Sequence, residues 1–145
     1  MEFVDEAISM TRADAARQGV RLEVDATGDL PVLNGDQVLL AQALFNLLRN
    51  AVEATRDQGG AEAVVAIGVR RTADGVEVAV ADRGGGIPAE TGPKLFEPFY
   101  TTKSEGMGMG LNITRSIIES HRGRLWFEAN PGGGSIFRFC IPEGS

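Results

Sequence analysis

A glycine-bracketed segment between two predicted secondary-structure elements constrains this chain most. It begins Asp82-Arg83-Gly84-Gly85-Gly86-Ile87-Pro88 and ends Gly106-Met107-Gly108-Met109-Gly110-Leu111. The run Val76–Ala81 before it alternates like a strand, and Asn112–His121 after it has helical spacing. Loops of about twenty residues inside a compact domain are uncommon and usually functional. Glycines that lead into a helix leave backbone N–H groups available to an anion, most often phosphate, so the segment predicts a phosphate-binding lid.

Composition narrows the class of protein. The 145 residues fit one domain, 1–145, with its own core. The net charge is −6 and no basic cluster exceeds Arg70-Arg71, which argues against a nucleic-acid surface. No apolar run approaches the roughly 18 residues of a membrane span, so we expect no membrane contact by this domain. The single cysteine, Cys140, is expected in the core, and one cysteine with one histidine cannot form a zinc site.

A long helix is predicted from Gln37 to Thr55. Its apolar face consists of Leu40, Ala43, Leu44, Leu47, Leu48 and Ala51. Asn46, Asn50 and Glu53 follow one another at i, i+4 and i+7 and therefore form one polar stripe. Because asparagine is a mediocre helix former, two of them on one stripe need a reason. A solvated helix face is the simpler interpretation, and a stripe that faces a ligand is the alternative.

Asp82 occupies a position in its predicted strand from which side chains point toward the core. It shares a side of its predicted strand with Val76, Val78 and Val80, so its carboxylate points toward the core. A buried carboxylate must find hydrogen-bond donors or lose its charge. Asp82 could cap the following turn through Gly84 and Gly85. Alternatively, its partner is the amino group of a ligand, for which the glycines leave room.

The rest of the chain predicts a mixed order of helices and strands. A first helix is expected over Glu2–Arg17, and the helix after the lid carries Ile113, Ile117 and Ile118 on one face. Strands are expected at 20–25, 31–33, 63–72, 76–82, 124–129 and 135–141. Asp74-Gly75 signals a hairpin. This order predicts an α/β two-layer sandwich, with one sheet covered by helices on one face.

Four stretches of the chain resemble the nucleotide-binding motifs of sensor histidine kinases. The segment from Asn46 to Ala54, Asn-Leu-Leu-Arg-Asn-Ala-Val-Glu-Ala, resembles the N box, and Asp82-Arg83-Gly84-Gly85-Gly86-Ile87 resembles the first glycine box. Leu95-Phe96-Glu97-Pro98-Phe99, continued by Tyr100-Thr101-Thr102-Lys103, is similar to the F box. The segment from Gly106 to Leu111 resembles the second glycine box. One such motif is a weak indication, but four in this order cover essentially the whole chain.

The resemblance implies the Bergerat ATP-binding fold of gyrase, Hsp90 and MutL. This fold has a mixed, mostly antiparallel sheet covered on one face by helices, and a flexible ATP lid. The resemblance implies that Asp82 accepts a hydrogen bond from the adenine amino group and that Asn50 holds Mg²⁺. Asn46 is then close to the metal and phosphates, and Lys103 is a candidate phosphate contact; these two and Asn50 form the implied catalytic set. The implied nucleotide-binding positions are Asn50, Asp82, Gly84, Gly86, Ile87, Phe96, Thr101, Thr102, Lys103, Gly106, Met107, Gly108, Met109, Gly110 and Leu111.

The implied function is the phosphoryl-donor half of an ATP-dependent protein-histidine kinase in two-component signal transduction. The domain would bind Mg-ATP and ADP and transfer the γ-phosphate to a histidine on a separate helical hairpin. We expect that dimerisation and phosphoacceptor domain to be absent from this chain, and a response regulator would be reached only indirectly. His121 matches a family position outside the acceptor motif, so we expect a structural or surface role for it. The domain is expected in the cytoplasm, whether or not its parent kinase is membrane-bound.

Three alternatives stay open. Gyrase- and Hsp90-like ATPases carry a water-activating glutamate where this chain has Asn46, and asparagine cannot serve as that base. Anti-sigma-factor serine kinases usually carry a glutamate there too, and they lack the Phe-Glu-Pro-Phe stretch. A nucleotide-binding interaction module without transfer activity is the third. Glu53 also departs from the lysine or other polar residue of many relatives, so no phosphate contact is assigned to it.

Overall fold

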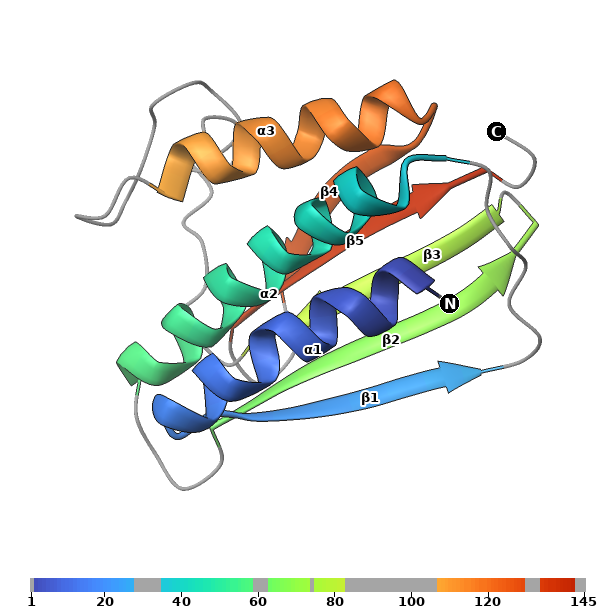
Figure 1. Ribbon diagram of the computed structural model, residues 1–145. Coiled ribbons are helices and arrows are strands. Elements are labelled where there is room, and N and C mark those ends of the chain that lie inside the picture. Colours follow the sequence, from blue (N-terminus) through green and yellow to red (C-terminus); the bar gives the residue numbers. More distant parts are fainter. Residues whose placement is uncertain are drawn as a thin grey trace.

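The computed structural model describes residues 2–27, 35–58, 63–73, 75–82, 107–129 and 134–142. In this part of the chain, three helices cover one face of a five-stranded sheet (Figure 1). The helices are α1 (Glu2–Arg17), α2 (Gln37–Gln58) and α3 (Met107–Ser120). The strands are β1 (Arg21–Thr27), β2 (Val64–Thr72), β3 (Gly75–Ala81), β4 (Arg124–Ala129) and β5 (Ser135–Ile141). The predicted two-layer α/β sandwich is confirmed.

The sheet is mixed, with strand order β1-β2-β3-β5-β4. β1 and β2 pair in parallel, and α2 makes the crossover that a parallel pair requires. The other three pairings are antiparallel. β2 and β3 meet in a tight turn in which Thr72 pairs with Gly75, as the Asp-Gly signal predicted.

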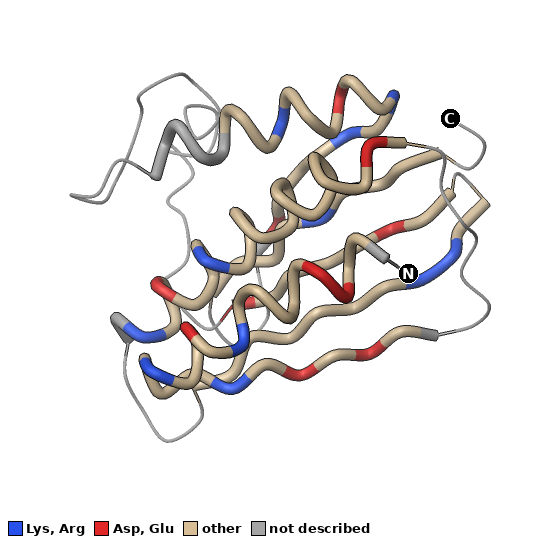
Figure 2. The backbone as a smooth tube through the Cα atoms, viewed as in Figure 1, with Lys and Arg blue, Asp and Glu red and all other residues tan. Residues whose placement is uncertain are grey.

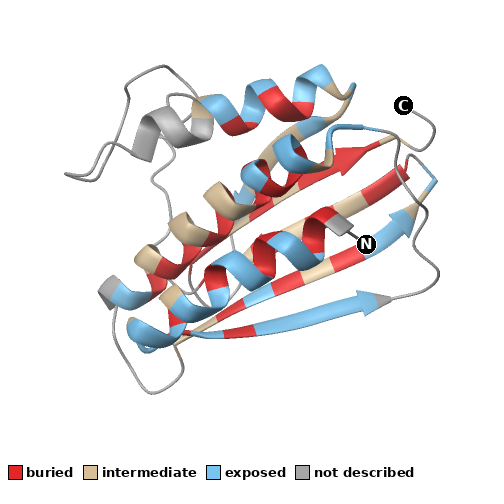
Figure 3. Cartoon of the chain, viewed as in Figure 1, coloured by how far each residue is buried: buried red, intermediate tan, exposed pale blue. Residues whose placement is uncertain are grey.

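The core lies between the sheet and the helices. Alternate strand residues point to the helices, so Val76, Val78 and Val80 on β3 are buried. Phe137, Phe139 and Ile141 line the same side of β5, and the ring of Phe139 lies 6.3 Å from that of Phe3 on α1. Figure 3 shows this burial on the inner sides of both layers. Cys140 is buried, as predicted.

The apolar face predicted for α2 is the face that packs against the sheet. Leu40, Leu44, Leu47 and Leu48 are at most 1% exposed. Burying one such side chain contributes roughly 1.5–3 kcal/mol. Acidic and basic residues are interspersed along the described elements rather than gathered in one region (Figure 2). Of the helices that the structure describes, none combines the length and the apolar content needed to cross a membrane.

Two helices are longer than the sequence predicted. α2 continues three residues past Thr55 to Gln58. α3 begins at Met107, inside the second glycine run, rather than at Asn112. Glycine is a poor helix former, which is why the sequence placed this turn in a loop. The packing of α3 along α2 compensates for that low propensity.

Of the three isoleucines predicted on the buried face of α3, Ile117 and Ile118 are buried, and only Ile113 was predicted wrongly. Ile113 is 41% exposed, whereas the next residue, Thr114, is fully buried beside Ile117 and Ile118. A threonine does not count in a hydrophobic pattern, so the pattern selected the neighbouring isoleucine instead. The short strand expected at 31–33 lies outside the described residues.

Candidate functional site

The polar stripe of α2 lies along the seam between α2 and α3. Asn46, Asn50 and Glu53 are all half-buried rather than exposed. α3 runs antiparallel to α2 beside them (Figure 1). Asn46 Nδ2 donates a hydrogen bond of 3.4 Å to Thr114 Oγ1 on α3. The simple interpretation of a solvated helix face therefore does not describe this stripe.

The contact between Asn46 and Thr114 fixes how the two helices align along their length. Each residue of an α-helix advances about 1.5 Å, and the two helices run in opposite directions. Four residues beyond Asn46 is Asn50, and four residues before Thr114 is Gly110. Asn50 is therefore level with the first turn of α3, which begins at Met107. The first N–H groups of a helix lack intrahelical partners and favour anions, so the Asn50 amide stands beside a potential phosphate-binding helix end.

Asp82 is buried where β3 ends. It is 5% exposed, on the helix-facing side that its parity predicted. Its Oδ1 accepts a hydrogen bond of 3.1 Å from the Ser135 N–H, and its own N–H donates to the Ser135 oxygen at 2.8 Å. These bonds extend the β3–β5 pairing and fix the carboxylate. An ionised carboxylate can accept about four hydrogen bonds, so this one can bind the Ser135 N–H and a ligand's donor together.

Asp82, the second half of α2 and the start of α3 lie at the same end of the sandwich. β2 begins shortly after α2 ends, and β3 runs antiparallel to β2, so Asp82 lies at the end of the sheet that the α2 C-terminus reaches. α3 also begins at this end (Figure 1). The structure thus brings together an acid, two amides and a helix N-terminus from distant parts of the sequence. Such a set can bind a ligand that carries both a hydrogen-bond donor and an anionic group.

Part of the predicted site lies outside the described residues. These positions are Gly84, Gly86, Ile87, Phe96, Thr101, Thr102, Lys103 and Gly106. For Met107, Gly108, Met109, Gly110 and Leu111 the structure describes the backbone, which forms the first turns of α3. The roles predicted for their side chains stay predictions.

The sequence did not reveal two residues that form hydrogen bonds with side chains of the candidate site. Ser135 supplies the N–H that binds Asp82, and Thr114 accepts the hydrogen bond of Asn46. Thr114 precedes Ile117 and Ile118 by three and four residues, so helical spacing alone could have placed it on the buried face. Ser135 offered no comparable signal, because any residue at that strand position except proline carries the same N–H.

His121 joins the end of α3 to the start of α2. The Asp36 N–H donates to its Nε2 at 3.0 Å, and its Nδ1 lies 2.8 Å from the Ile117 carbonyl oxygen. A carbonyl only accepts, so Nδ1 carries the hydrogen and Nε2 is the acceptor. Gly35 leaves the room that the ring needs, because a Cβ there would lie 2.7 Å from His121 Cδ2. Both ring nitrogens therefore serve the fold.

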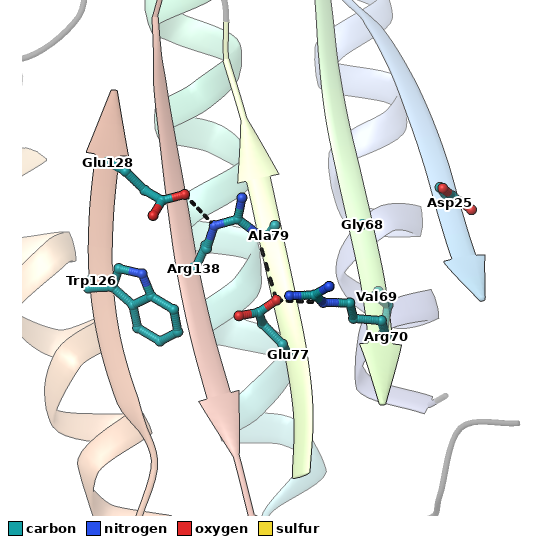
Figure 4. A pocket seen from close by; sticks show the side chains of 9 residues that line it. All are labelled: Asp25, Gly68, Val69, Arg70, Glu77, Ala79, Trp126, Glu128 and Arg138. Carbon is teal, nitrogen blue, oxygen red and sulfur yellow. Dashed lines mark hydrogen bonds and ion pairs between the residues drawn. The ribbon is translucent and has the colours of Figure 1, made fainter. Parts of the chain in front are cut away.

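A separate hollow of about 490 Å³ lies on the open face of the sheet (Figure 4). Small residues, Gly68 and Ala79, form part of its lining, and Trp126 stands at one side. A chain of ion pairs crosses it. Arg70 Nε lies 2.8 Å from Glu77 Oε2, which is 3.7 Å from Arg138 Nη1. Arg138 Nε also lies 2.6 Å from Glu128 Oε1. None of the described site residues predicted from the sequence lines this hollow, and the sheet separates it from α2.

Comparison with known proteins shows which family the chain resembles. The family described as histidine kinase-, DNA gyrase B-, and HSP90-like ATPase matches residues 35–145. The sensor protein FixL of Bradyrhizobium diazoefficiens is 41% identical over 97% of this chain and 28% of its own length. The C4-dicarboxylate transport sensor protein DctS of Rhodobacter capsulatus is 40% identical over 97% of this chain and 22% of its own length. The chain thus spans less than a third of these relatives.

Solved structures agree with this placement. The catalytic domain of the histidine kinase ThkA, in a nucleotide-free form, has a TM-score of 0.86 and 32% identity, covering 98% of this chain and 91% of that one. Full-length ShkA in complex with AMPPNP has a TM-score of 0.82 and 25% identity, covering 97% of this chain and 29% of that one. The chain therefore belongs to the family of histidine kinase-, DNA gyrase B- and HSP90-like ATPases, among the catalytic domains of sensor histidine kinases.

Proposed function

We propose that this chain binds Mg-ATP at the end of the α2–α3 seam and donates the γ-phosphoryl group to a histidine on a separate helical hairpin. One observation carries the proposal: the half-buried Asn50 is level with the first turn of α3, and Asp82 is buried at the same end of the sandwich. The ShkA structure, a complex with AMPPNP, supports a triphosphate analogue as the ligand of this fold.

Each group has a role that matches its chemistry. Asp82 accepts a hydrogen bond from the adenine amino group, while the Ser135 N–H keeps the carboxylate in place. The Asn50 amide oxygen is a ligand suited to Mg²⁺, which prefers oxygen donors and keeps several waters and phosphate oxygens. When bound, the metal would neutralise phosphate charge. The first N–H groups of α3 would receive the phosphates.

The residues of the stripe favour phosphoryl transfer over hydrolysis. Hydrolysis in this fold needs a base to activate water, and an amide at Asn46 cannot take a proton. Transfer to an imidazole needs no such base, because the neutral ring nitrogen is already a nucleophile. Phosphoryl transfer then depends mostly on positioning and on charge neutralisation.

The acceptor must come from outside this chain. His121 lies at the far end of α3, a 14-residue helix, and therefore about 20 Å from the phosphate-binding turn. Its ring nitrogens also contact Asp36 and Ile117. We infer that the acceptor is the histidine hairpin of a longer parent kinase, which passes the phosphoryl group on to a response regulator in the cytoplasm.

Titration calorimetry with ADP, in the presence of Mg²⁺ or of EDTA, tests the binding half of this function. Asp82→Ala should weaken binding about tenfold or more under both conditions, because the adenine amino group loses its acceptor. Asn50→Ala should remove the part of the affinity that requires Mg²⁺. Gln42→Ala is the matched control, since Gln42 is exposed on the same side of α2 but two turns away from Asn50. Unchanged ADP affinity in Asp82→Ala would refute the assignment.

Radiolabelled ATP tests the transfer half. The chain alone should bind ATP and stay unlabelled, and acid-labile label should appear on a sensor-kinase histidine hairpin when one is added. Label on the chain itself, lost in His121→Ala, would contradict transfer to a separate hairpin. Binding of ATP without labelling of any supplied hairpin would favour a nucleotide-binding module.

A further inference from the structure

We propose that Thr114 is a positioning residue of the nucleotide site. Its hydroxyl orients the Asn46 amide and holds α3 level with Asn50, and the Mg²⁺-dependent part of nucleotide affinity depends on it. This inference rests on the proposed function, because it concerns the same seam between α2 and α3.

The burial of Thr114 shows that the seam contains a polar position that packing does not require. Thr114 is fully buried, and the neighbouring buried positions of α3 are Ile117 and Ile118. A valine has nearly the same shape as threonine and would bury no hydroxyl, so packing alone favours valine. Burying a hydroxyl is unfavourable unless it is hydrogen-bonded, and at this seam the Asn46 amide donates to it. The hydroxyl of Thr114 thus gives Asn46 Nδ2 a contact that a valine at this position would not offer.

The contact also decides which end of the Asn46 amide is presented to the site. The Nδ2 group donates to Thr114, so the carbonyl oxygen on the same amide carbon points to a different side. Without the hydroxyl, the amide can rotate, and its oxygen and nitrogen can exchange places. An oriented oxygen is what a bound cation or its water requires, and fixing it beforehand lowers the cost of binding.

The length of this hydrogen bond limits what it contributes to stability. At 3.4 Å it lies beyond the usual range for N–H···O bonds, so its own energy is small. The main consequence of losing it should be geometric. Thr114 lies seven residues after the first residue of α3, so a small rotation of α3 there also shifts the turn beside Asn50. Function should therefore change more than stability.

The chain offers a matched control for the loss of a buried threonine hydroxyl. Thr11 on α1 is 1% exposed, and its hydroxyl donates to the Ala7 oxygen at 2.7 Å. Thr11→Val and Thr114→Val remove the same group from nearly the same degree of burial. Only the second substitution touches the seam between α2 and α3. Thr114→Ser restores the hydroxyl without the methyl group.

The experiment measures ADP affinity by calorimetry with Mg²⁺ and with EDTA for each variant. The ratio of the two affinities is the Mg²⁺-dependent gain. Thr114→Val should reduce this gain about two- to threefold, whereas Thr114→Ser should keep it near the wild-type value and Thr11→Val should leave it unchanged. A merely structural role would lower the melting temperature of Thr114→Val and leave the ratio at the wild-type value.

A double-mutant cycle with Asn46→Ala tests whether Thr114 acts through Asn46. In the Asn46→Ala background, Thr114→Val should cause little further loss of the Mg²⁺-dependent gain. Additive losses would overturn the inference, and so would an unchanged gain in Thr114→Val. If Thr114→Val does not fold, Thr114→Ser and Thr114→Cys supply the comparison, and equal gains in these two would also overturn it. A wild-type chain without Mg²⁺-dependent ADP binding would instead refute the proposed function.

Discussion

Replacing His121 with alanine should destabilise the domain without touching the nucleotide site. The ring accepts the Asp36 N–H at 3.0 Å and donates to the Ile117 oxygen at 2.8 Å. Each such bond contributes about 0.5–1.5 kcal/mol net, so His121→Ala should lower the free energy of unfolding by roughly 1–3 kcal/mol. For a domain of this size, 1 kcal/mol corresponds to about 3 °C, which predicts a melting temperature about 3–9 °C lower.

Thermal unfolding followed by circular dichroism measures this loss. His121→Asn should lose about half as much, because an asparagine amide can replace Nδ1 but does not reach the Asp36 N–H. Glu119→Ala is the control, since Glu119 is exposed in the same last turn and pairs with Arg115 at 3.2 Å on the surface. An unchanged melting temperature in His121→Ala would refute the structural role. A loss of ADP affinity larger than the loss of stability would place His121 in the site.

Further substitutions separate the roles of other positions. Gly68→Thr should raise the free energy of unfolding by about 0.5–1 kcal/mol, because a Cβ there meets nothing within 4 Å and Gly68 is in a strand. Gly75→Ala should lower the free energy of unfolding, because Gly75 has φ 142° and a Cβ there would collide with the backbone of β5. Denaturant unfolding measures both substitutions, and equal effects of Gly68→Thr and Gly75→Ala would contradict both expectations. Leu47→Ala should cost about 2–5 kcal/mol and Asn50→Ala less than about 1 kcal/mol. A loss of several kcal/mol in Asn50→Ala would mean that the stripe belongs to the core.

Hydrophobic periodicity predicted most of the fold. The bounds of α1, β4 and β5 agree with those that the sequence pattern predicted. The pattern failed where polar residues take buried positions. Thr114 carries no hydrophobic signal, so Ile113 was assigned to the buried face of α3 in its place, and the glycines near Met107 hid the start of that helix.

The site was predictable in its components but not in its contacts. Strand parity placed Asp82 in the core, and helical spacing placed Asn46 and Asn50 on one stripe. Neither argument could find Ser135 or Thr114, which lie 53 and 68 residues away from their partners. Such contacts depend on how two elements are rotated and aligned relative to each other. A single sequence records the preferences of each element and not this alignment.

The two faces of α2 explain why we expect different substitutions to reduce nucleotide binding and folding stability in this domain. One face buries leucines against the sheet, and each contributes on the order of 2 kcal/mol to folding. The other face carries the half-buried amides, and it meets α3 through the long hydrogen bond from Asn46 to Thr114. Apolar packing of Ile117 and Ile118 holds α3 in the same core, and the contact from Asn46 to Thr114 sets the orientation of the amide at the seam. Because the first turn of α3 belongs to the proposed phosphate site, substitution of Asn50 or Thr114 should change nucleotide binding before it changes folding, whereas substitution of His121, beyond the other end of α3, should change folding alone.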